Sequence, residues 1–169
     1  MDTIDQQILH TLQENGRITN SDLAKKVGLS APSVLERVRK LEEAGVITGY
    51  AAKINAAKVG RGQTCYVAIS LALHQIGNIH EFQKEIEQIP EVIDCFHITG
   101  EEDFLLKVQV RNMNHYEDLL LSRLTKIPGT SKIKTMVVLS TIKSGTKLEL
   151  SKEELESTGA GKSKPRIRG

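Results

Sequence analysis

The chain has 169 residues, of which 39% are hydrophobic and 26% are charged, as in ordinary folded proteins. Its 23 lysines and arginines stand against 21 aspartates and glutamates, so the formal net charge is +2 and a strongly basic, histone-like protein is excluded. Two cysteines are too few for a disulfide-stapled secreted domain, and the longest nearly apolar run, residues 67–73, is far shorter than the ~20 residues of a membrane span. We therefore expect a cytoplasmic protein that does not enter a membrane.

Apolar residues recur at helical spacing in three N-terminal segments, which polar and glycine residues separate. Asn20 or Ser21 is expected to cap the second helix, and Gly28 follows it where a helix end favours glycine. Ser30 caps the third helix, with Pro32 in its first turn. The apolar stripes comprise Ile4, Ile8, Leu9 and Leu12, then Leu23, Ala24 and Val27, then Val34, Leu35, Val38 and Leu41.

A short helix, a tight glycine turn and a longer helix are typical of a helix-turn-helix, whose second helix can lie in the DNA major groove. The residues expected to face DNA are Ser30, Ser33, Arg37 and Lys40. Arg37 is the leading base or phosphate contact, whereas Arg39 sits beside Val38 and is a weaker candidate. Residues 46–47 and 50–54 flank Thr48-Gly49 and suit a short wing of paired strands. The alternative is a helical bundle whose basic face is merely solvated.

Residues 64–150 repeat one pattern twice. A strand over 65–73 is followed by a helix that Pro90 stops and by a strand over 92–99. A strand over 104–110, a helix that Pro128 stops and a strand over 133–142 follow, with residues 148–150 as a candidate extension of the sheet. This is the ferredoxin-like βαββαβ pattern, and right-handed crossovers place both helices on one sheet face.

The other face of this sheet needs a cover. The first strand presents Tyr66, Ala68, Ser70 and Ala72 there, and these side chains are mostly small. A solvated face would be expected to carry more Lys, Glu and Thr. We therefore expect two chains to pack sheet against sheet as a homodimer.

The charge is unevenly distributed along the chain. Residues 1–63 carry nine Lys or Arg and seven Asp or Glu, residues 64–150 carry nine and eleven, and residues 151–169 carry five and three. Any nucleic-acid surface therefore belongs to the N-terminal part or to residues 151–169, which are expected to be a flexible basic tail that adds nonspecific DNA contacts.

The chain shows no pattern of a catalytic or metal site. Cys65, Cys95 and His97 lack the paired spacing of zinc ligands, and no nucleophile–base–orienter arrangement appears. We expect no metal, no cofactor apart from an amino-acid effector, and no enzymatic activity. A disulfide between Cys65 and Cys95 is not expected, because their strands are not neighbours in the predicted sheet.

Residues 1–150 resemble the Lrp/AsnC family, the feast/famine transcription regulators. The N-terminal motifs that carry the resemblance are Met1-Asp2-Thr3-Ile4-Asp5, Asn15-Gly16-Arg17-Ile18, Asp22-Leu23-Ala24, Val27-Gly28-Leu29-Ser30 and Leu41-Glu42-Glu43-Ala44-Gly45-Val46-Ile47. Farther on, Thr99-Gly100-Glu101-Glu102-Asp103-Phe104 is similar to the family's effector loop.

The resemblance implies an α+β chain with an N-terminal winged helix-turn-helix and a C-terminal ferredoxin-like effector domain. We expect a DNA-binding domain over residues 1–48, a hinge or linker strand over 49–63, an effector-binding and oligomerisation domain over 64–150, and the tail over 151–169. The family further implies a sequence-specific, nucleoid-associated regulator that binds double-stranded DNA as a homodimer assembling to an octamer. Its effectors would be amino acids or related metabolites, bound between dimers.

The effector loop also has a physical rationale. Gly100 lets a carboxylate approach backbone N–H groups, and Asp103 suits an ammonium group. The resemblance adds Thr99 and Glu101 from the loop, and Phe96, Met113, Met136, Val137 and Val138 nearby. Glu102 departs from the aromatic residue common in the family, which indicates a basic or polar ligand, or none. The alternatives are a metabolite-sensing module that acts through protein contacts and a regulator without effector.

Overall fold

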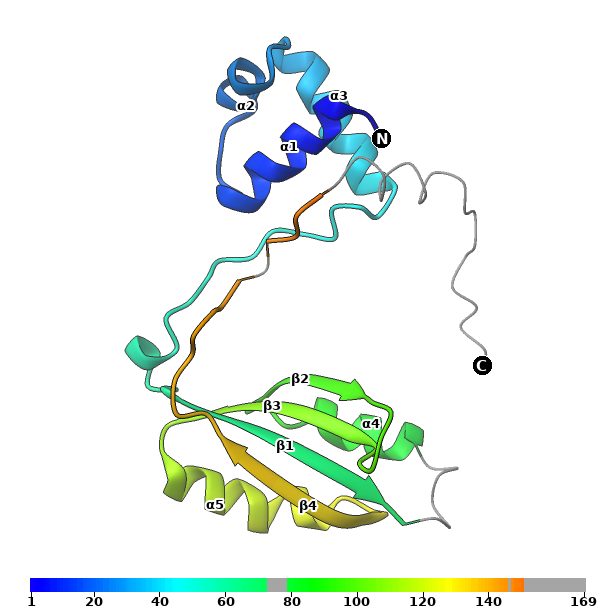
Figure 1. Cartoon of the computed structure of the whole chain (residues 1–169), viewed down its shortest axis with the longest axis vertical. Coiled ribbons are helices and arrows are strands. Elements are labelled where there is room, and N and C mark those ends of the chain that lie inside the picture. Colours follow the sequence, from blue (N-terminus) through cyan, green and yellow to red (C-terminus); the bar gives the residue numbers. More distant parts are fainter. Residues whose placement is uncertain (73–78, 146, 151–169) are drawn as a thin grey trace. The chain divides into compact units, whose positions relative to one another are not determined.

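The structure, a computed structural model, describes residues 1–72, 79–145 and 147–150, which form two units (Figure 1). One unit combines Met1–Ala52 with the described residues of 143–150, and the other comprises the described residues of Lys53–Ile142. The first is helical and the second contains a β-sheet. The tail predicted over residues 151–169 lies outside the described residues. No helix in the described part of the chain is long and apolar enough to cross a membrane.

The helical unit consists of α1 (Thr3–Glu14), α2 (Asn20–Val27) and α3 (Ala31–Glu43). Ser30 caps α3 as predicted, since its side chain accepts a hydrogen bond from the Ser33 N–H. Gly28 ends α2 with a φ of 71°, a left-handed conformation that glycine adopts without strain. The predicted cap of α2 is wrong: Asn20 and Ser21 already belong to the helix, and Thr19 is the cap.

The core of the helical unit follows the predicted apolar stripes with one exception. Ile8 and Val34 are inaccessible to solvent, and Val38 and Leu41 pack beside them. Leu35 was expected in the same stripe, but its side chain is 53% exposed. Because successive helical residues turn by about 100°, Leu35 points away from the direction that Val34 and Val38 share.

The segment after α3 does not form the predicted wing strands, since residues 44–56 contain no strand. Instead, the later segment 147–150 packs on α1. The Gln13 amide donates to the Leu148 carbonyl at 3.1 Å and accepts from the Leu148 N–H at 2.6 Å, and Lys147 lies 3.0 Å from Glu14. Leu150 packs against the helical core. The prediction that residues 148–150 extend the sheet is therefore wrong.

The sheet unit begins with the short helix η1 (Ala57–Val59) and contains strands β1 (Gln63–Leu71), β2 (Val92–His97), β3 (Phe104–Val110) and β4 (Thr130–Val137). Helix α4 (Ile79–Glu87) lies between β1 and β2 in the chain, and α5 (Met113–Ser122) with η3 (Leu124–Lys126) lies between β3 and β4. All neighbouring strands are antiparallel in the order β2-β3-β1-β4. Strand β4 begins directly after Pro128-Gly129 and ends at Val137. It therefore begins and ends earlier than the predicted strand over 133–142.

Both helices cover one face of the sheet, as predicted (Figure 1). Phe82 of α4 stacks on Phe104 of β3 with ring centroids 4.2 Å apart. The main residues of this core are Cys65, Val67, Ile69, Phe82, Ile86, Phe104, Leu106, Val108, Tyr116 and Leu119. The two cysteines are free, and β3 separates the strands that carry them.

On the opposite face, no helix among the described residues covers the sheet. The register places Leu105 and Phe96 in line with Ala68, and Met136 beside Tyr66. Phe96 is 51% exposed. This open face, defined by Tyr66, Ala68, Ser70, Phe96, Leu105 and Met136 together with Lys107 and Lys134, therefore mixes apolar, small and charged side chains.

Candidate DNA-binding and effector sites

The N-terminus of α3 holds two of the residues predicted to face DNA. Ser30 Oγ accepts from the Ser33 N–H at 3.3 Å, and the two hydroxyl oxygens lie 2.8 Å apart. Both residues are exposed. Because the helix dipole and free N–H groups favour an anion at this end, the pair is well placed for a phosphate oxygen.

Arg37, the leading predicted DNA contact, is engaged inside the helical unit. Its Nη1 lies 2.8 Å from Asp2 Oδ2 and 2.7 Å from Asp5 Oδ1. The hydrogen bonds to Asp5 and Asp2 raise the pKa of the guanidinium. The pKa of the Asp2 carboxyl is lowered, first by the Asp5 N–H and then by Arg37. Arg37 thus ties α3 to the start of α1, a contact that helical spacing could not indicate because its partners lie 32 and 35 residues away.

The outward face of α3 carries a ladder of exposed ion pairs. Glu36 lies 3.3 Å from Lys40 Nζ and 3.7 Å from Arg39 Nε, and Arg39 Nη1 lies 3.3 Å from Glu43. Exposed pairs of this kind contribute little and exchange readily. Arg39, the weaker candidate by spacing, is 61% exposed and joins Lys40 as a basic group on this face.

The loop between β2 and β3 contains the predicted residues Thr99, Gly100, Glu101 and Asp103. Gly100 is exposed, with a φ of 134° that side chains rarely adopt. Asp103 faces the protein: its Oδ2 accepts from the Leu71 N–H at 2.7 Å, and its own N–H donates to the Ile69 carbonyl at 3.0 Å. The carboxylate expected to hold an ammonium group therefore fastens the loop to the end of β1.

The predicted effector residues 136–138 lie toward the opposite end of β1. The Val138 N–H donates to the Thr64 carbonyl at 3.0 Å, and Val137 pairs with Cys65 in the register. Seven residues separate Thr64 from Leu71, which corresponds to ~23 Å along a strand. Residues 136–138 and the loop 99–103 are therefore far apart within one protomer.

Met113 belongs to the same end of the sheet as Val137. It is the first residue of α5, 42% exposed. One turn later, the Tyr116 hydroxyl hydrogen-bonds the Thr135 hydroxyl of β4, so the first turn of α5 lies beside the end of that strand. Phe96 belongs to neither group, because it occupies the open face in line with Ala68. One protomer thus does not assemble the predicted effector site.

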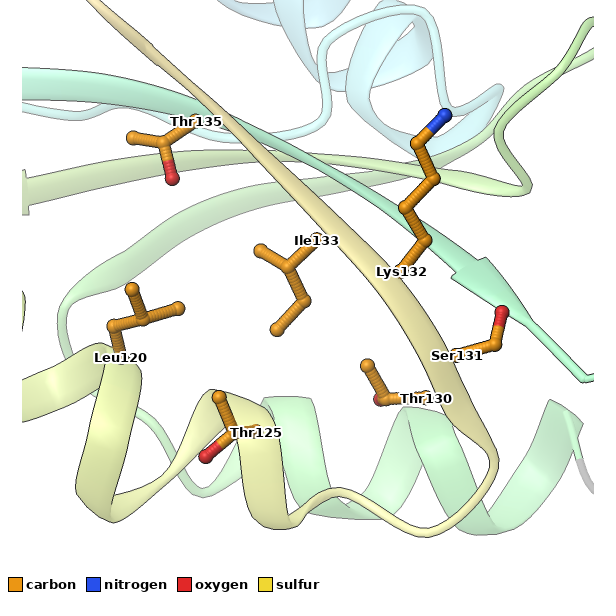
Figure 2. Close-up of a pocket in the computed structure, with 7 residues that line it drawn as sticks. All are labelled: Leu120, Thr125, Thr130, Ser131, Lys132, Ile133 and Thr135. Carbon is orange, nitrogen blue, oxygen red and sulfur yellow. The ribbon is translucent and has the colours of Figure 1, made fainter.

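An open pocket of about 390 Å³ lies between β4 and the α5–η3 segment (Figure 2). Leu120, Thr125, Thr130 and Ile133 point toward one another, whereas Lys132 points away. The Thr130 hydroxyl is buried without a hydrogen-bond partner in the described part of the chain. No predicted effector residue lines this pocket, and no motif in the sequence indicated it.

Comparison with known proteins identifies both units. Residues 1–48 match the family model for a winged helix-turn-helix DNA-binding domain, and residues 64–148 match the Lrp/AsnC ligand binding domain. The leucine-responsive regulatory protein of Rhizobium meliloti (strain 1021) is 37% identical over 150 residues, which cover 89% of this chain and 96% of that protein. The chain belongs to the Lrp/AsnC family. It is a DNA-binding transcriptional regulator with a ligand-binding domain.

Solved structures of Lrp/AsnC-type regulators have the same fold. A transcriptional regulator from Neisseria meningitidis, solved in complex with L-Met, is 34% identical with a TM-score of 0.85, covering 88% of this chain and 96% of that one. An AsnC family regulator from Agrobacterium tumefaciens is also 34% identical with a TM-score of 0.83, covering 88% and 97%. The predicted α+β architecture, a winged helix-turn-helix with a ferredoxin-like effector domain, is confirmed. The matched relatives are regulators by name, not enzymes.

Glu102 folds back onto the sheet. Its side chain is 17% exposed, and its Oε1 lies 3.7 Å from Lys134 Nζ without a hydrogen bond among the described residues. Lys134 pairs with Ala68 in the register, on the open face. The Glu102 carboxylate therefore meets a lysine of its own sheet instead of extending away from the loop.

Proposed function

We propose that this regulator changes its assembly and its binding to double-stranded DNA in response to an amino acid or a related metabolite, held between protomers. The separation of the two effector groups along β1 carries the proposal. A ligand whose carboxylate meets the Gly100 loop and whose side chain meets Met113 and Val137 needs the loop of one protomer and the second group of another. The Neisseria meningitidis complex with L-Met and the leucine-responsive relatives support an amino acid as the ligand.

The open face supplies the contact for a second copy of the chain. Its centre, Ala68 with Leu105 and Phe96, offers apolar and small side chains, of which Phe96 is half exposed. Covering this face with the same face of a partner forms a self-complementary homodimer. Further association of dimers, up to the octamer, then brings effector loops to the second groups of neighbouring dimers. We place this assembly in the cytoplasm, at the nucleoid.

On the DNA side, we propose contacts by Ser30, Ser33 and Lys40, and we add Arg39. The serines lie at the positive end of α3, and both basic residues lie in exposed ion pairs that a phosphate can replace. We assign Arg37 to holding α3 against α1, because Asp2 and Asp5 share its guanidinium.

A thermal-shift screen of the twenty amino acids tests the effector. A ligand at 100 times its dissociation constant stabilises the folded protein by about 2.7 kcal/mol, which shifts Tm visibly. If none of the twenty shifts Tm while DNA binding is intact, the amino-acid effector is contradicted, which leaves another metabolite or a regulator without effector. A ligand response with no salt-dependent DNA binding instead favours the module that acts through protein contacts.

Mixed oligomers test whether the site is shared. Thr99→Arg blocks the loop group and Met113→Arg blocks the second group, while Gln83→Arg on exposed α4 is the matched control. Each blocking variant alone loses the ligand-induced shift and the control keeps it. When the two blocking variants are refolded together, about a quarter of shared sites contain two intact halves, so part of the response returns. No recovery in the mixture would place the ligand within one protomer.

A further inference from the structure

Helix α3 presents one large apolar side chain at its surface. Of the four large apolar residues of this helix, Val34, Val38 and Leu41 are buried in the helical core, whereas Leu35 is 53% exposed. A single exposed leucine is ordinary on a protein surface. This one lies on the second helix of a helix-turn-helix, the helix that enters the major groove of DNA. Its direction and its neighbours therefore bear on what α3 reads.

Arg37 shows in which direction Leu35 points. The Arg37 Nη1 reaches Asp2 and Asp5 at the start of α1, at 2.8 Å and 2.7 Å. Successive residues turn by about 100° around a helix axis, so Leu35 and Arg37 lie about 160° apart on α3. Leu35 therefore points away from the start of α1. By the same geometry it lies about 40° from Arg39, which is 61% exposed and one of the proposed DNA contacts.

The chemistry of Leu35 matches one group in the major groove. The N-terminal part of a recognition helix is the part that meets base edges, and Leu35 is the fifth residue of α3. A leucine side chain neither donates nor accepts hydrogen bonds, and among the four bases only thymine carries a methyl group in this groove. Phosphates offer a leucine no favourable contact, and the exposed carboxylate of the neighbouring Glu36 repels them. This part of α3 is therefore suited to base edges and not to the DNA backbone.

We propose that Leu35 is a specificity-determining residue of this regulator, whose side chain contacts the 5-methyl group of a thymine in the major groove. The inference rests on the DNA-binding function of the helical unit. The contact favours thymine at one position of each half-site without any hydrogen bond, because it removes two apolar surfaces from water together. Removal of the methyl group from the base and truncation of Leu35 therefore abolish the same contact, and the second change adds nothing to the first.

The test uses uracil, which is thymine without its methyl group. The full chain selects a duplex from a random-sequence library, and this duplex is resynthesised with each thymine in turn replaced by uracil. Fluorescence anisotropy at one fixed salt concentration then gives the affinity of the wild type, Leu35→Ala and Leu35→Gln for every duplex. The matched control is Leu121→Ala, which truncates a leucine that is 59% exposed on α5 of the sheet unit. The Tm of each variant verifies that it is folded.

The wild type and Leu121→Ala are expected to lose about fourfold in affinity when uracil replaces the contacted thymine, which is the effect of exposing one buried methyl group. Both Leu35 variants should bind the thymine duplex more weakly and lose nothing further with uracil at that position. If uracil weakens binding equally in the Leu35 variants, another residue contacts the methyl group and the proposal is overturned. Wild-type affinity that is unchanged by uracil at every position also overturns it, while DNA binding stands. Absence of binding by the wild type to any duplex of the library overturns the DNA-binding function itself.

Discussion

The residues proposed to contact DNA and the residues proposed to bind the effector differ in how much of a site one protomer supplies. Ser30, Ser33, Arg39 and Lys40 lie within eleven consecutive residues on one helix and its cap, so a single chain presents them together. The effector residues occupy a loop fastened to Leu71 and a second group beside Thr64, at the two ends of β1. A contiguous motif can thus describe a complete surface in one domain and only half of a surface in the other.

The largest expected effect separates the two units. Phe104 is buried in the core of the sheet unit and stacks on Phe82, so Phe104→Ala should lower the free energy of unfolding of that unit by about 3–5 kcal/mol. Hydrogen exchange measured by mass spectrometry should lose protection in the sheet unit while residues 3–43 keep theirs. Val34→Ala is the converse control, since Val34 belongs to the helical core. Equal loss of protection in both units would show one cooperative fold.

A smaller effect distinguishes two arginines of α3. Arg39→Ala should lower affinity for a selected duplex by about 1–3 kcal/mol if Arg39 takes a guanine edge, with Tm nearly unchanged because its ion pairs are exposed. Arg37→Ala should lower Tm, because it leaves the Asp2 and Asp5 carboxylates without their shared partner. Anisotropy and calorimetry on the same samples make the comparison. If Arg37→Ala lowers the affinity for DNA and leaves Tm unchanged, Arg37 is a DNA contact after all.

The smallest effect is a pH dependence of the α1–α3 contact. The folded protein lowers the pKa of the Asp2 carboxyl from its ordinary value of 3.8, so the stabilisation is present above that pH and is lost as the pH falls below it. Arg37 supplies part of this shift. The difference in Tm between the wild type and Arg37→Ala should therefore shrink between pH 5 and pH 2. If the difference in Tm stays constant across this range, the ion pair between Asp2 and Arg37 contributes nothing to that difference.

Features set by neighbouring residues could be predicted from the sequence. The Ser30 cap, the Gly28 turn and the strand–helix–strand repeat each depend on spacing within a few residues, and all three are present. Features set by distant partners could not. The engagement of Arg37 depends on Asp2, that of Asp103 depends on Leu71, and the position of Leu148 depends on Gln13. Local periodicity contains no information about such pairs, which only the tertiary fold brings together.

The wing and Leu35 show a second limit. Thr48-Gly49 has the composition of a turn, but a turn forms a hairpin only if its flanks find pairing partners, and residues 44–56 remain without strands. Leu35 satisfies an apolar pattern by residue type, yet its direction on α3 exposes it. An apolar sequence pattern therefore places a side chain around the helix axis less precisely than the geometry of the folded helix does.

The docking of residues 147–150 on α1 has a topological consequence. The chain leaves the helical unit after Ala52 and belongs to it again from Lys143, so the sheet unit is an insertion within the DNA-binding unit. Two covalent connections therefore join the units, one on each side of the insertion. After a single protease cut in either connection, the two fragments are held together only by the packing of residues 147–150 on the helical unit.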